Sequence, residues 1–136
     1  MTKKRFLRRA HGDDQAAVAA GLALFLRECE VVGDAVIVVP TLKNVSATML
    51  TGVLGHELAK RLYKDRSLPW GGATISLCSD ATLKNYRNAK VYLALWSTNH
   101  LVDEIEQLGS WRSLVWVTWL PDEANAWAEK FNPSIF

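Results

Sequence analysis

Four short apolar runs, set between segments with helical spacing, constrain the fold of this chain more than any other feature. The runs span residues 35–39, 73–78, 91–96 and 114–120, and many of their residues are β-branched or aromatic. Such runs are typical of strands in a buried sheet. Because strands that alternate with helices are joined by right-handed crossovers, the chain is expected to form an α/β protein with a mostly parallel, four-stranded sheet.

The apolar faces of the runs predict their order in the sheet. Runs 35–39 and 91–96 are apolar on both faces, whereas run 73–78 alternates apolar with small polar residues, which is typical of an edge strand. With the strands numbered in chain order, these faces favour the order 2-1-3-4 in a three-layer, flavodoxin-like or Rossmann-like domain. In this arrangement run 114–120 forms the second edge.

The segments between the runs carry helix start and stop signals. Asp14 can cap a helix that ends near Gly33, residues 50–62 carry a second apolar face, and Gly109 ends a later helix. A short helix is expected after residue 79 and a terminal helix after residue 121. Residues 65–72 contain Pro69 and a Gly-Gly pair and are predicted to be a loop.

Composition places the chain among soluble globular proteins. The 136 residues are 49% hydrophobic and 22% charged, which suits one domain over residues 13–136. No apolar stretch approaches the roughly 20 residues that span a bilayer. Cys29 and Cys78 lie far apart in apolar segments, as expected of reduced core thiols. We therefore expect a cytoplasmic protein that does not enter membranes.

Positive charge is concentrated at the start of the chain. Five of the 16 basic residues lie within residues 3–9, and the remainder holds 11 basic against 14 acidic residues. Residues 1–12 are predicted to form a flexible basic arm, which is a weak indication of nucleic-acid or acidic membrane binding. A solvated, frayed terminus explains the same charges.

The carboxyl ends of the first and third strands are the expected ligand site, since ligands of open parallel sheets bind where the strand order reverses. Two helix N-termini would open there toward a phosphate or carboxylate. Asp103 and Glu104 would repel such an anion, and the hydroxyl and amide side chains could simply cap helices. The candidate ligand-binding residues are Thr41, Lys43, Asn44, Ser46, Ser79, Asp80, Ser97, Thr98, Asn99 and His100.

Motifs for named chemistries are missing from the sequence. It contains no phosphate-binding P-loop, and Gly71-Gly72 precedes a strand, so it is no dinucleotide fingerprint. His56-Glu57 resembles the start of a zinc-protease helix, but Lys60 stands where the second histidine is required. His100 has no carboxylate or nucleophile at a recognisable spacing. No catalytic residue is assigned, and no metal or cofactor is expected.

Tryptophans gather on or just before the fourth predicted strand, which would form an apolar edge of the kind that soluble proteins usually cover. The terminal helix, with Trp127 and Phe131, is one cover. The same strand of a second subunit is another, which would make a homodimer. The interface candidates on this strand are Leu114, Trp116, Thr118, Trp119 and Leu120.

Two classes of function fit these observations. The first is a small binding or interaction module with a regulatory or accessory role. The alternative is a small enzyme or sensor that binds a nucleotide or another phosphate-bearing ligand at the carboxyl ends of strands one and three. The lack of a paired acid and base favours the first class, and the sequence leaves open whether the protein is an enzyme.

Overall fold

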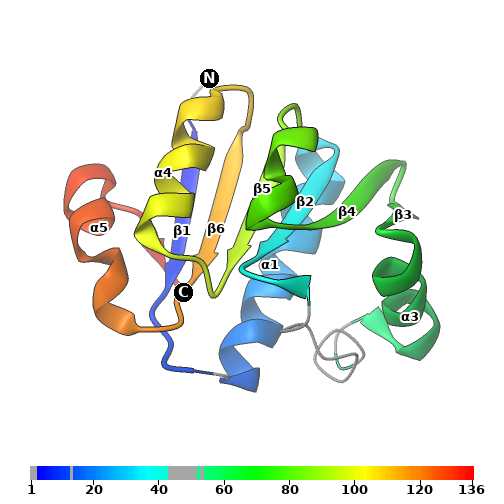
Figure 1. The fold of residues 1–136 in the computed structure, drawn as a ribbon, viewed down its shortest axis with the longest axis horizontal. Coiled ribbons are helices and arrows are strands. Elements are labelled where there is room, and N and C mark those ends of the chain that lie inside the picture. The colour runs from blue at the N-terminus through cyan, green and yellow to red at the C-terminus, as the bar shows by residue number, and fades with distance from the viewer. Residues whose placement is uncertain (1–2, 13, 43–51, 53) are drawn as a thin grey trace.

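The computed structural model describes residues 3–12, 14–42, 52 and 54–136 and shows one sheet with helices on both faces (Figure 1). The predicted α/β class is confirmed, whereas the predicted four strands are too few, because the sheet has seven in the order β3-β4-β2-β5-β6-β1-β7. The strands are β1 (Lys4–Arg8), β2 (Ala35–Val39), β3 (Ser67–Trp70), β4 (Ala73–Ser79), β5 (Val91–Leu95), β6 (Ser113–Val117) and β7 (Ser134–Ile135). The helices are α1 (Gln15–Val32), α3 (His56–Asp65), α4 (Asn99–Leu108) and α5 (Asn125–Phe131), with 3-10 helices η2 (Asp80–Asn85) and η3 (Pro121–Ala124).

The centre of the sheet consists of the four runs seen in the sequence. They form β2, β4, β5 and β6, which are neighbours in the order β4-β2-β5-β6 and run parallel. Ala35 of β2 lies beside Val91 of β5, so the first and third runs are adjacent, as the site prediction requires. Every residue of β2, β5 and β6 is buried, which explains why these runs show no polar face.

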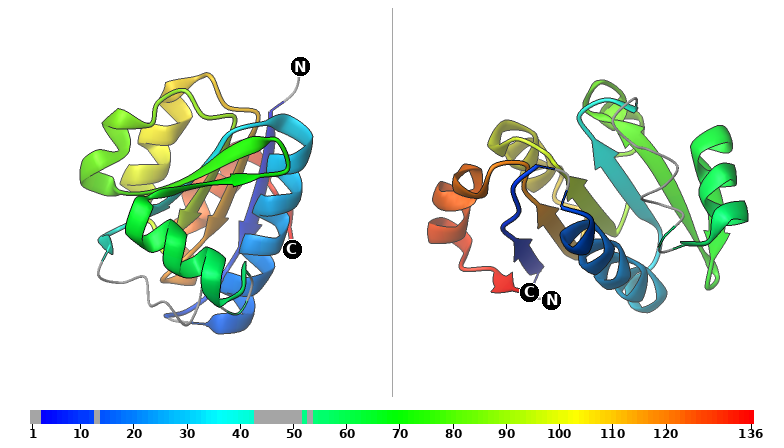
Figure 2. Two further views of the ribbon diagram at one scale, coloured as in Figure 1. Left: turned by 90° about the vertical axis from the view of Figure 1, so that its right-hand side faces the viewer. Right: turned by 90° about the horizontal axis from the view of Figure 1, so that it is seen from below.

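Helices cover both faces of the sheet (Figure 2). On one face α1 and α3 enclose an apolar cluster with β2 and β4. On the other face η2, α4 and α5 enclose a second cluster. Helix α1 lies so close to β6 that a Cβ atom added to Gly21 would stand 2.6 Å from Val117 Cγ2.

Most predicted helix ends are confirmed. The Asp14 side chain accepts a hydrogen bond from the Ala17 N–H at 3.1 Å, and Gly33 ends α1. Gly109 ends α4 in the left-handed conformation, with φ +76°. In the second predicted helix α3 buries Ala59 and Leu62, whereas residues 43–51 and 53 lie outside the described part of the chain.

The predicted loop at residues 65–72 is wrong in part, because it contains β3. This strand pairs antiparallel with β4 through the two-residue turn Gly71-Gly72, whose φ angles are +52° and +84°. Positive φ at both turn positions matches the twist of a hairpin, and glycine adopts it without strain. Pro69 lies on β3 at the edge of the sheet, where a missing N–H costs no ladder bond. Strand β4 is therefore not an edge.

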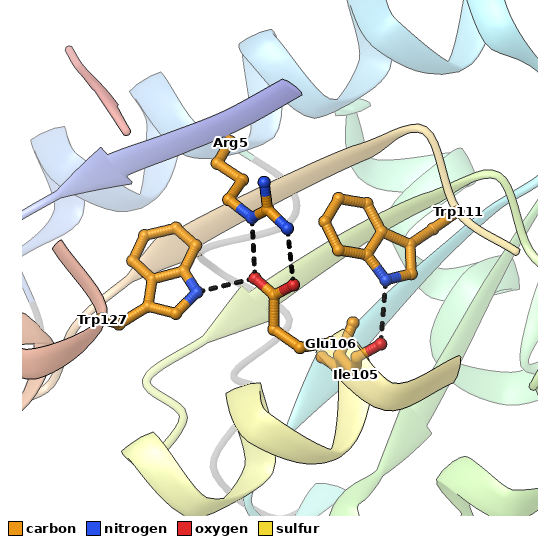
Figure 3. Close-up of polar contacts among 5 residues, drawn as sticks. All are labelled: Arg5, Ile105, Glu106, Trp111 and Trp127. Atoms are coloured by element: carbon orange, nitrogen blue, oxygen red, sulfur yellow. Dashed lines mark hydrogen bonds and ion pairs between the residues drawn. The ribbon is translucent and has the colours of Figure 1, made fainter. Parts of the chain in front are cut away.

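The predicted flexible arm is also wrong, because residues 4–8 form β1 between β6 and β7. Leu7 is fully buried. The Arg5 guanidinium donates two hydrogen bonds of 2.8 Å to Glu106, and Trp127 Nε1 donates a third of 2.8 Å to the same carboxylate (Figure 3). The apolar pair Phe6-Leu7 and the paired Arg5 thus anchor a segment whose charge suggested a solvated terminus.

The predicted dimer edge does not exist, because β6 already has a partner on each side. It pairs with β5 and with β1, so two copies of β6 cannot join across subunits. Trp119 and Leu120 follow the end of β6 and are 44% and 46% exposed. The other three interface candidates, Leu114, Trp116 and Thr118, are fully buried inside one chain.

Candidate functional site

The carboxyl ends of β4, β2 and β5 meet at one edge of the sheet, because these strands are parallel neighbours. We call this the carboxyl edge. Thr41 follows β2 there and is exposed. Three candidates, Lys43, Asn44 and Ser46, lie outside the described residues. The structure brings the remaining candidates to this edge: Ser79 and Asp80 at the end of β4, and Ser97, Thr98, Asn99 and His100 after β5.

The turn after β5 has an unusual backbone. Trp96 has φ +59°, a left-handed conformation that non-glycine residues rarely adopt. Its side chain is 4% exposed and packs edge-to-face against Trp119, with ring centroids 5.9 Å apart. A bulky residue held in this conformation costs of order 1–3 kcal/mol, and such strain is concentrated at functional sites. The strained turn leads directly into Ser97 and helix α4.

Unpartnered polar atoms are concentrated at the carboxyl edge. In the described part of the chain, five buried side-chain atoms lack a hydrogen-bond partner, and four of them belong to residues 80 and 96–99. They are Asp80 Oδ1, Trp96 Nε1, Ser97 Oγ and Asn99 Oδ1. Buried polar atoms are nearly always paired in folded proteins, so each exception requires an explanation. The carboxyl edge is therefore a candidate polar site.

Helix capping accounts for only some of the predicted residues. Thr98 Oγ1 accepts a hydrogen bond from the Leu101 N–H at 3.3 Å and is the N-cap of α4. Ser79 and Thr82 form a capping box at the start of η2. By contrast, the Ser97 hydroxyl is fully buried and caps nothing. Helix capping therefore explains the hydroxyl groups of Thr98 and Ser79 but not that of Ser97.

Asp80 has an altered acidity. Burial, and to a smaller extent the nearby Glu104, raise the pKa of its carboxyl group from 3.8 to about 6, while His100 acts in the opposite direction. His100 Nε2 lies 3.3 Å from Glu104 Oε1 on α4. A carboxyl group with this pKa is partly protonated near neutral pH, so Asp80 can either donate or accept a hydrogen bond there.

A shallow hollow of about 310 Å³ lies between η2 and α4. Asp80 and Glu104 line it from opposite sides, together with Lys84 and Arg87. The volume falls at the lower limit for small-molecule sites. Asp80 thus borders a space that a small ligand can enter.

Trp96 is the residue that the sequence prediction missed, because nothing in a sequence reports a positive φ at a tryptophan. Among the residues described, no group of three or more His, Cys, Asp and Glu side chains could hold a metal ion. Nor does the described part of the chain contain a helix with the length and apolar character of a membrane span. The chain matches no protein-family model, no curated protein and no solved structure.

Proposed function

We propose that this protein is a binding module that holds a small, hydrogen-bond-donating ligand at the carboxyl edge of its sheet. One observation carries the proposal: four of the five unpartnered buried polar atoms in the described structure lie in residues 80 and 96–99. Each such atom costs roughly 1–3 kcal/mol while it stays unpaired. A ligand that pairs with them recovers this free energy on binding.

The unpartnered atoms favour a hydroxyl- or amine-bearing ligand over an anion. Two of them, Asp80 Oδ1 and Asn99 Oδ1, are carbonyl-type or carboxylate oxygens that accept hydrogen bonds. The Ser97 hydroxyl can donate or accept, and Trp96 Nε1 can only donate. Asp80 and Glu104 offset the positive charge of Lys84 and Arg87 in the adjacent hollow, so the site has no net positive charge that would favour a phosphate group. A sugar hydroxyl, which both donates and accepts, fits this set.

The stability of the ligand-free protein provides the first test. Replacing Ser97 with Ala removes a buried hydroxyl that has no partner, so Ser97→Ala should leave the free energy of unfolding unchanged or raise it by about 1 kcal/mol. The neighbouring Thr98→Ala removes a helix cap and should lower it by about 1 kcal/mol. Urea denaturation measures both variants. A loss for Ser97→Ala equal to that for Thr98→Ala would contradict the proposal.

The second test is ligand binding to the full chain. Thermal unfolding is followed with D-ribose, D-glucosamine or sodium phosphate, since a ligand of the native state raises Tm in proportion to RT ln(1 + [L]/Kd). We expect at least one sugar to raise Tm of the wild type, and neither to raise Tm of Ser97→Ala. Stabilisation by phosphate alone would contradict the proposed ligand chemistry.

One observation favours a second candidate, an enzyme acting on a phosphate-bearing substrate. The pKa of about 6 at Asp80 suits a general acid or base near neutral pH. If Asp80 has this role, the protein should release phosphate from AMP or ATP, and Asp80→Asn should reduce the rate by roughly 100-fold or more. Equal rates for wild type and variant would remove Asp80 as the acid or base.

A further inference from the structure

A second hollow, of about 610 Å³, lies at the start of β1, away from the carboxyl edge. One side is formed by Lys3, Lys4, Arg5 and Phe6, and the other by residues 131–134, which connect α5 to β7. The lining includes three cations, two phenylalanines and no carboxylate. We call this hollow the β1 pocket. Its volume is in the range of small-molecule sites.

The two lysines supply the positive charge available in the β1 pocket. Arg5 is already paired with Glu106 (Figure 3), and its guanidinium stacks 4.1 Å from the Phe131 ring centroid. Lys4 is 58% exposed and only 3.9 Å from Glu28, whose Oε1 also accepts a hydrogen bond from Ser113 Oγ. In the described structure Lys3 forms no ion pair, and its Nζ lies 4.4 Å from the Trp111 ring centroid. Lys3 can therefore bind an anion directly, and the largely exposed Lys4 can join it by giving up its long contact with Glu28.

The fold holds this charge in place. Residues 4–8 form a strand with a buried Leu7, so Lys4 is presented from a fixed backbone and Lys3 directly precedes it. Because the rest of the chain has 11 basic and 14 acidic residues, the field that attracts an anion is concentrated at β1. An ordered basic surface loses less entropy on binding than the flexible arm that the sequence suggested.

We propose that the β1 pocket binds a nucleotide, either free or as part of a single strand, with Lys3 and Lys4 on its phosphate and the base against the phenylalanine side. Lysine is a suitable point charge for phosphate. Aromatic side chains beside basic ones are the usual features of single-strand binding, because every base can pack on a ring.

The alternative anion is an acidic peptide. Carboxylates are best recognised by the planar guanidinium of an arginine, which bonds both oxygens. Arg5 is the arginine that lines the pocket, and it is already committed to Glu106 through two hydrogen bonds. The free groups are thus suited to phosphate, and an acidic peptide serves as a competitor in the test.

The test uses the full chain and a fluorescent oligothymidylate of about ten nucleotides, within the usual site sizes. Fluorescence anisotropy gives Kd over a range of salt concentrations for the wild type and the double variant Lys3→Ala/Lys4→Ala. The matched control is Lys60→Ala/Lys64→Ala, which removes two exposed lysines of α3. Circular dichroism checks that all three proteins fold.

We expect the wild type to bind and the β1 variant to bind at least roughly tenfold more weakly at low salt, with its salt slope reduced by about 0.7 for the one phosphate that both lysines contact. The control should keep the wild-type Kd. Competition by AMP would identify a free nucleotide as sufficient, whereas competition only by unlabelled oligonucleotide would identify a strand. No binding, equal loss in both variants, or equal competition by inorganic phosphate or a polyglutamate peptide would overturn the proposal.

Discussion

Removing the Glu106 carboxylate should destabilise the protein substantially, because this group pairs with three N–H donors from distant segments. Arg5 Nε and Nη2 donate to its two oxygens at 2.8 Å, and Trp127 Nε1 donates to Oε2 at 2.8 Å. The arginine and glutamate side chains are only 19% and 12% exposed, so water replaces the lost bonds poorly. Glu106→Ala leaves a guanidinium and an indole N–H without their partner.

The expected cost is about 3 kcal/mol. Breaking a fully buried ion pair costs roughly 3–5 kcal/mol, and the partial exposure of this pair favours the lower limit. For a chain of this length such a loss lowers Tm by about 10 °C. Glu106→Gln retains an oxygen that can accept from Trp127 but removes the ionic contact, so its loss should be intermediate.

Urea denaturation and a thermal scan measure these changes, with Gln107→Ala as the control. Gln107 is the next residue of α4 and is exposed, so its replacement should change the free energy of unfolding by less than about 0.5 kcal/mol. Hydrogen exchange should show that amides of β1 lose protection first in Glu106→Ala. A loss below about 1 kcal/mol would refute the inference that this cluster anchors β1.

Three further predictions concern the acid, the thiols and the closest helix contact. The folded-state pKa of Asp80 is about 6 against an ordinary 3.8, so the native state favours the neutral acid. The stability of the wild type should therefore fall relative to that of Asp80→Asn as pH rises from about 4 to 7. Thermal scans across this range, with Asp65→Asn as control, would contradict the assignment if the difference in stability stayed constant. Burial raises the pKa of Cys29 to about 11 and that of Cys78 to about 12, so iodoacetamide at pH 8 should modify both only after unfolding, and rapid labelling of the native protein would exclude this. Gly21→Ala should cost about 1–3 kcal/mol, since its new methyl group would overlap Val117, and an unchanged urea midpoint would show that α1 shifts freely.

The central part of the fold could be predicted because its signals are local. Runs such as 35–39 and 91–96 are apolar on both faces, and capping residues such as Asp14 and Gly109 act within their own helix. The edges could not be predicted in the same way. Strand β1 depends on contacts with β6 and α4, more than a hundred residues away, and its charges resembled those of a frayed terminus. The hairpin at Gly71-Gly72 had a local signal, but Pro69 favoured a loop.

The carboxyl edge was predictable from topology, since it required only that β2 and β5 be parallel neighbours. The sequence named Asp80, Ser97 and Asn99 within a longer list. It could not separate them from Thr98, because a capping hydroxyl and an unpartnered one look alike until hydrogen bonds are known. The acidity of Asp80 and the backbone of Trp96 depend on burial and on tertiary packing.

The position of β1 has a consequence for how the chain acquires its shape. Among the strands of this sheet β1 is made first, yet its two neighbours are β6 and β7, which are made after the other four. Arg8 donates a hydrogen bond to the carbonyl of Phe136, 128 positions away. During synthesis β1 therefore stays unpaired until β6 and β7 have been made, and closing the long loop between β1 and β6 is slow. The basic residues of β1 help keep the unpaired strand solvated until β6 and β7 are made.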